Sequence, residues 1–432
     1  MQLGKYLFFN RFKIAFILVL LSNIILAVIL LFPNLESYLG FDLWNDFTSG
    51  IVRKFYYPSY VVFSGIPGYG GLFTYWHSIT PLYPFLSACL TLLIGNIPAA
   101  SIIVASACSF LSLVFFRKIL KEYCLFNDDR TYIMLNIYAS FYMTAQCFCI
   151  PSPISIVPFF AIMDMYFVLK YFKDPSGKNL AFMSFVFTAT TFSREILWPI
   201  IAFPFIIVFV LLILVKRGKT RGVRAIKLSS ILLLFVAMLI PVVIYACYFV
   251  GLNLFHALGI TMYNLNIMNN RSVESVLYNV FTTITFYWIF VAISFIYFGY
   301  SRIRGIFKNR ARIHDSPSNG NNNHSTAQVG DIVQGVHSFE PYFHEKFVNA
   351  IFVLWFSFYI LYRIIVPGPF WAIYYFPVLY LASFFVYRGI QTISKDHFER
   401  TFWIILVIMV LLNLANLFRL DPFWWSFSIL NM

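Results

Sequence analysis

Long apolar runs separated by short polar stretches recur along the chain from Lys13 to Leu420. Most of these runs have about 17 to 25 residues, the length that an α-helix needs to cross the hydrocarbon core of a bilayer. Backbone groups inside a bilayer find no water to bond, so such runs are expected to be helices. The predicted spans are 14–32, 98–116, 131–150, 154–171, 180–194, 196–215, 228–250, 277–299, 347–365, 371–388 and 401–420. The pattern therefore predicts an all-α fold, a polytopic transmembrane bundle of about eleven helices that forms one domain over residues 1–432.

Two long segments interrupt this pattern. Residues 305–340 are rich in Asn, Gly and Ser and poor in apolar residues, so we expect a disordered cytoplasmic loop there. Residues 33–80 instead mix acids, cations, glycines and aromatic residues, and we expect them to form the first non-cytoplasmic loop. Residues 81–94 are apolar, but they are few and include two prolines, so we predict a helix near the non-cytoplasmic surface rather than a crossing.

Composition and charge agree with a membrane protein. The chain is 60% hydrophobic and 11% charged, whereas soluble domains have about 25% charged residues. The net charge of +14 would suggest nucleic-acid binding in a soluble protein, but 25 of the 31 Lys and Arg fall in loops that this topology places on the cytoplasmic side. The positive-inside bias of membrane proteins accounts for that distribution without any nucleic acid. We expect a multi-pass protein of the cell membrane in a prokaryote, or of the endoplasmic reticulum membrane in a eukaryote.

The segment 33–80 contains two aspartates, Asp42 and Asp46. They are four residues apart, so in a helix both carboxylates lie on one face. A partly desolvated carboxylate beside the membrane can act as general base on a sugar hydroxyl. The alternative is a structural role, with Asp42 as a helix cap and Asp46 as a solvated surface acid. The segment has no Asp-x-Asp pair, so no cofactor is predicted and a divalent metal has no motif to support it.

The rest of this segment resembles the first loop of the GT-C glycosyltransferases. The residues that carry the resemblance are the acid Asp46 with Phe47, the turn of Gly65, Pro67 and Tyr69, and the loop end of Tyr75, Pro81, Leu82, Tyr83 and Pro84. Similar loops belong to archaeal and bacterial polyprenyl-phosphate-sugar-dependent enzymes and to the GPI-anchor mannosyltransferases. The resemblance assigns Asp46 as the catalytic base. The spacing from Asp46 to Gly65 is longer than the family pattern, which leaves Asp42 as the alternative base.

This resemblance implies an inverting hexosyltransferase, with mannose as the favoured sugar. Its donor would be a polyprenyl or dolichyl phosphate sugar. Its acceptor would be a glycan, glycolipid or protein on the lumenal or extracytoplasmic face.

Other residues on the predicted non-cytoplasmic side would complete such a site. An Arg side chain binds phosphate bidentately, so Arg194 is the first candidate for the donor phosphate and Arg363 the second. Either Arg would otherwise extend to lipid headgroups. The candidate substrate-binding residues are Tyr69, Tyr75, His77 and Glu195. No second His or acid stands at metal-ligand spacing from His77, and an aromatic belt at the membrane surface accounts for most of the tyrosines.

Two other functions stay open. A transporter or flippase of a lipid-linked or small solute needs ionisable residues near the midplane, and among the predicted spans only Asp164 lies there. We expect Asp164 to be a neutral, hydrogen-bonded structural residue. A non-catalytic subunit of a glycosylation complex would keep the fold and would need no acid in the first loop.

Overall fold

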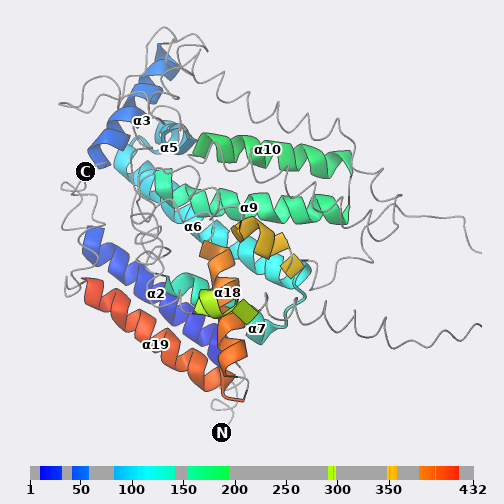
Figure 1. Cartoon of the computed structure of the whole chain (residues 1–432). Coiled ribbons are helices and arrows are strands. Elements are labelled where there is room, and N and C mark those ends of the chain that lie inside the picture. The colour runs from blue at the N-terminus through cyan, green and yellow to red at the C-terminus, as the bar shows by residue number, and fades with distance from the viewer. Residues whose placement is uncertain are drawn as a thin grey trace, which may run out of the picture.

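The computed structural model describes residues 10–31, 41–57, 82–141, 144, 153–174, 176–193, 290–294, 296–297, 348–349, 351–357, 379–394 and 396–417. In this part of the chain the structure is helical and no strand is present. The helices labelled in Figure 1 are α2 (Arg11–Leu31), α3 (Phe41–Tyr56), α5 (Leu82–Ile94), α6 (Ile97–Glu122), α7 (Asp128–Ser140), α9 (Pro153–Lys173), α10 (Gly177–Ser193), α18 (Leu379–Ile393) and α19 (Phe398–Leu417). The all-α prediction is confirmed for the residues described.

Five predicted spans coincide with helices to within a few residues at most of their ends. These helices are α2, α6, α9, α10 and α19, and α6 continues six residues beyond its predicted end. Helix α18 overlaps the predicted span 371–388 and extends five residues beyond its predicted end. The predicted spans 196–215 and 228–250, and the predicted disordered loop 305–340, lie outside the described residues.

Two helices differ from the expected pattern. Helix α7 begins after Asn127, whose side chain accepts a hydrogen bond from the Arg130 backbone nitrogen at 3.0 Å. It ends at Ser140, because Phe141 has an extended backbone with φ −63° and ψ 130°. A continuous helix over 131–150 is therefore wrong. Helix α3 lies within the segment 33–80, which was expected to be a loop.

The turn between α5 and α6 explains why two apolar helices form here instead of one. Gly95 has φ +72°, a left-handed conformation that glycine adopts without steric cost. The Asn96 side chain then accepts a hydrogen bond from the Ala99 nitrogen at 2.9 Å and caps α6. The helix predicted over 81–94 is confirmed as α5.

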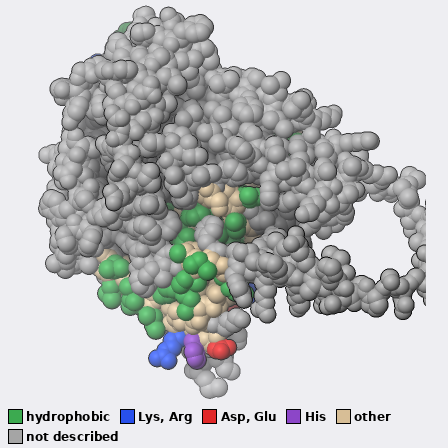
Figure 2. Space-filling model, viewed as in Figure 1, with side chains coloured by type: hydrophobic (Ala, Val, Ile, Leu, Met, Phe, Trp, Pro, Cys, Tyr) green, Lys and Arg blue, Asp and Glu red, His purple; other side chains and the backbone are tan. Residues whose placement is uncertain are grey.

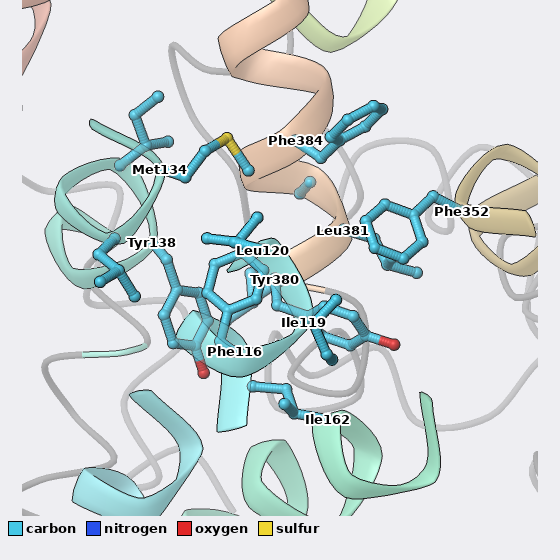
Figure 3. Packing of buried hydrophobic residues seen from close by; sticks show 14 of the residues in the cluster. Phe116, Ile119, Leu120, Met134, Tyr138, Ile162, Phe352, Tyr380, Leu381 and Phe384 are labelled. Carbon is cyan, nitrogen blue, oxygen red and sulfur yellow. The ribbon is translucent and has the colours of Figure 1, made fainter. Parts of the chain in front are cut away.

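Two apolar clusters hold the helices together. The larger cluster joins α2, α6, α7, α9, α10, α18 and α19, and Figure 3 shows Phe116, Tyr138 and Tyr380 packed within it. The smaller cluster joins α3 and α5 to α6, α9 and the last turns of α10. The partly buried Phe115 and Met163 pack against both clusters, so the packing is continuous along the bundle.

Aromatic contacts bring the basic ends of several helices together. The ring of Tyr387, near the end of α18, lies 5.8 Å from that of Phe126 in the turn between α6 and α7. It also lies 5.4 Å from the ring of Phe398 at the start of α19. The Tyr166 hydroxyl of α9 donates to the Glu122 carboxylate at the end of α6, at 3.2 Å. These contacts define one end of the bundle, which we call the basic end.

Ion pairs link the helix termini at the basic end. Arg11 at the start of α2 pairs with Glu399 of α19 at 2.7 Å. Lys121 of α6 pairs with Asp128 of α7, and this hydrogen bond lowers the pKa of the Asp128 carboxyl. Arg11 and Lys121, two cations of the predicted cytoplasmic segments, thus lie at helix ends that meet in space.

Several of the described helices expose apolar side chains. One helix of the described part, α6, is long and apolar enough to cross a membrane. Exposed large apolar residues also line α2 and α19: Ile17, Leu18, Leu21 and Ile25, and Ile404, Val407, Ile408 and Leu411. In Figure 2, apolar side chains cover much of the coloured surface, and charged and histidine side chains gather at its lower end. This distribution supports association with a membrane.

Candidate functional site

Helix α3 carries both acids of the candidate site. Asp42 and Asp46 occupy positions one turn apart on the same face. Continuing at helical spacing, Ser49 and the exposed Arg53 fall on that face too. Asp42 is the second residue of the helix, where an acid stabilises the helix dipole. Asp46 lies one turn further into the helix.

The opposite face of α3 holds the helix against the bundle. Thr48 and Ile51 are fully buried, and Ile51 packs in the smaller cluster with Tyr83 of α5. The rings of Phe55 and Phe85 meet edge to face, with 5.9 Å between their centroids. The buried Thr48 and Ile51 and the exposed Arg53 thus lie on opposite faces of α3.

Helix α5 is the support on which α3 rests. It begins at Leu82, so Leu82, Tyr83 and Pro84 of the predicted loop end lie in its first turn, whereas Tyr75 and Pro81 lie outside the described residues. Tyr83 is fully buried, and its hydroxyl donates to the Ser101 carbonyl of α6 at 3.1 Å. Tyr83 and Pro84 are therefore core residues that fix α5 on α6. In this structure their contribution to a site is positional.

The last turns of α10 reach the same end of the bundle. Ala189 of α10 belongs to the smaller cluster, together with Ile51 of α3. Arg194 directly follows Ser193, where α10 ends. The structure therefore brings the acid-bearing helix and the residue before Arg194 to one end, away from the basic end (Figure 1).

The other predicted site residues lie outside the described residues. They are Tyr69, Tyr75, His77, Arg194, Glu195 and Arg363. Arg53 was not among the predicted site residues. It follows Asp46 by seven residues, two helical turns, and so falls on the same face of α3.

The chemistry offered by α3 is that of carboxylates with a nearby cation. Two turns of helix separate the positions of Asp46 and Arg53 by about 10 Å along the axis. No group of three or more His, Cys, Asp or Glu comes together among the described residues to hold a metal ion.

Comparisons with models of protein families, with curated proteins and with solved structures found no match to this chain.

Proposed function

We propose that this chain is a multi-pass membrane glycosyltransferase of the GT-C type. It transfers a hexose, with mannose as the first sugar to test, from a polyprenyl-phosphate donor to an acceptor on the non-cytoplasmic face. The observation that carries the proposal is the place of α3, whose two acids lie at the end of the bundle remote from the basic end. In a membrane obeying the positive-inside rule, that end faces away from the cytoplasm.

The exposed apolar faces support several crossings. On α2, Val19 is 5% exposed and its neighbour Leu18 is 60% exposed. A soluble protein would leave polar residues on that outer face, whereas a lipid-facing helix keeps apolar residues on both faces. The same alternation recurs on α19, where Leu406 is buried and Val407 is exposed.

The reaction needs one base and one group that stabilises the leaving phosphate. The Asp46 carboxylate accepts the proton of the acceptor hydroxyl as its oxygen attacks the anomeric carbon of the donor. The bond from that carbon to the phosphate oxygen breaks, and the lipid phosphate leaves with the electron pair. Arg194, Arg363 or Arg53 stabilises the charge that develops on the phosphate. A single displacement of this kind inverts the anomeric carbon.

The two other functions make different demands. A transporter or flippase would use Asp164 in the interior of the bundle and would not depend on α3. A non-catalytic subunit would need neither acid. Transfer of labelled mannose by the purified protein distinguishes the proposed enzyme from both.

We predict that the 305–340 loop lies on the same side of the membrane as the N-terminus. In a cysteine-free background, Ser318→Cys should be protected from a membrane-impermeant maleimide applied to the non-cytoplasmic side. Ser64→Cys, in the segment 33–80, should react and serves as the control. Labelling of Ser318→Cys under those conditions would overturn the topology and every site assignment that depends on it.

We predict that Arg194→Ala weakens donor binding by about 10- to 100-fold, the usual worth of a charge-assisted hydrogen bond. Arg194→Lys should weaken donor binding less, because Lys keeps the positive charge although it lacks the bidentate geometry. Binding is measured with a fluorescent polyprenyl phosphate sugar, and Arg130→Ala at the basic end is the control. Unchanged donor binding in both variants would show that Arg194 contacts lipid headgroups and not the donor phosphate. Arg53 would then be tested in the same way.

A further inference from the structure

Asp164 of α9 is a fully buried acid at the centre of the bundle. Its neighbour Met163 packs against both apolar clusters. The sequence led us to expect a hydrogen-bonded Asp164, but neither of its carboxyl oxygens has a hydrogen-bond partner in the described structure. The Thr190 side chain of α10 approaches the Asp164 carboxyl as a hydrogen-bonding neighbour, but its geometry falls short of a formed hydrogen bond.

Two hydroxyl groups from other helices lie near this acid. Tyr380 of α18 is fully buried, its hydroxyl also has no hydrogen-bond partner in the described structure, and it lies close enough to Asp164 to interact electrostatically. Thr190 of α10 also neighbours Asp164. Its hydroxyl donates to the Val186 carbonyl at 3.0 Å, which leaves the hydroxyl oxygen free to accept a hydrogen bond.

The surroundings of Tyr380 are apolar. Figure 3 shows Tyr380 among Phe116, Ile119 and Leu381, and its ring lies 5.8 Å from that of Phe116. The next titratable group beyond it is Tyr138 of α7. Lys118 and Lys170 lie over the aromatic rings of Phe115 and Phe167, toward the basic end.

An ionised carboxylate cannot be sustained in such a place without a cation. Burying an unpaired charge costs far more than burying a neutral carboxylic acid. A neutral acid still loses free energy if its hydroxyl and carbonyl groups are left unbonded. A buried water molecule is stable when it has two to four polar partners. The Asp164 carboxyl, the Tyr380 hydroxyl and the Thr190 hydroxyl oxygen supply that number.

We propose that Asp164, Tyr380 and Thr190 form a proton-binding site inside the bundle, with one water molecule bridging the neutral acid to the two hydroxyl groups. The ligand is a proton, held on the Asp164 carboxyl, and the water satisfies the remaining oxygens. The site joins α9, α10 and α18 by polar contacts within an otherwise apolar interior. This inference does not depend on the glycosyltransferase activity.

Infrared spectroscopy of the purified protein in lipid vesicles tests the site directly. The spectrum of the parent minus that of Asp164→Asn, at about pH 8, should show the C=O stretching band of a protonated carboxylic acid. The band should shift in deuterium oxide, because the proton exchanges. It should shift again in Tyr380→Phe, because one partner of the bridging water is lost, and Tyr297→Phe, a half-exposed tyrosine elsewhere, should leave it unchanged.

The opposite result is equally distinct. A difference spectrum with the stretching bands of an ionised carboxylate would overturn the proton site, and sensitivity of those bands to sodium would identify a metal-cation site instead. If Asp164→Asn does not fold, the parent protein labelled with carbon-13 aspartate identifies the aspartate bands by their isotope shift. An acid band must persist at a pH at which exposed aspartates are fully ionised, and its absence contradicts the proposal.

Discussion

Asp46→Asn should reduce sugar transfer by about 10²- to 10⁴-fold, the usual contribution of a general base. The substitution keeps the shape of the side chain and removes its ability to accept the acceptor's proton. Expression and donor binding should stay close to those of the parent, because the phosphate and the lipid are bound by other groups. The measurement is initial transfer rate at saturating donor in reconstituted vesicles, with binding assayed separately.

The neighbouring acid provides the matched comparison. Asp42→Asn should reduce the transfer rate much less, because an acid in the first turn of α3 interacts with the helix dipole. Asp128→Asn, at the basic end, should leave transfer unchanged. If the Asp42 variant loses more than the Asp46 variant, Asp42 is the base and the enzyme class stands. If neither variant loses transfer, the resemblance of this segment to GT-C loops is structural only.

Gly389→Ala should destabilise the bundle by about 1–3 kcal/mol, the usual cost of overpacking a core, and Gly389→Val by more. A Cβ added at Gly389 would lie 2.4 Å from the Phe290 carbonyl oxygen and 2.9 Å from two further backbone atoms of Phe290. Those atoms belong to the helical turn at 290–294, and backbone cannot move aside as a side chain can. The turn is tied to α18 by the Ser294 hydroxyl, which donates to the Phe385 carbonyl at 2.5 Å.

Thermal unfolding of the detergent-solubilised protein measures this effect. Gly177→Ala is the control, because a Cβ there meets nothing within 4 Å. Its unfolding temperature should match that of the parent. A Gly389→Ala protein as stable as the parent would show that α18 and the turn at 290–294 do not approach as closely as described.

Helix positions were predictable from the sequence because apolar length is a strong signal. The bounds of α2, α9 and α19 follow directly from where apolar runs begin and end. The end of α7 was not predictable, because the residues around Phe141 are as apolar as those before it and the break lies in backbone geometry. Helix α3 was not predicted, because its segment is polar overall and its apolar residues lie on one face only.

The candidate site was predictable in part. The spacing of Asp42 and Asp46 predicted a shared helix face, and α3 supplies that helix. Tyr83 stood in a motif that suggested a site, yet it is buried against α6, because a tyrosine can satisfy its hydroxyl on a backbone carbonyl inside a core. The meeting of α3 with the end of α10 depends on packing through α5, which no local pattern encodes.

Sidedness of sugar transfer tests the central claim most directly. The purified protein is reconstituted in sealed vesicles with labelled polyprenyl-phosphate mannose, and a tag on the N-terminus separates the two orientations. A membrane-impermeant acceptor is then added outside. We expect transfer in vesicles whose N-terminus is enclosed, and none in vesicles whose N-terminus is exposed until detergent opens them. Transfer from the N-terminal side would contradict the placement of the site, and no transfer from any polyprenyl-phosphate sugar in opened vesicles would contradict the enzyme itself.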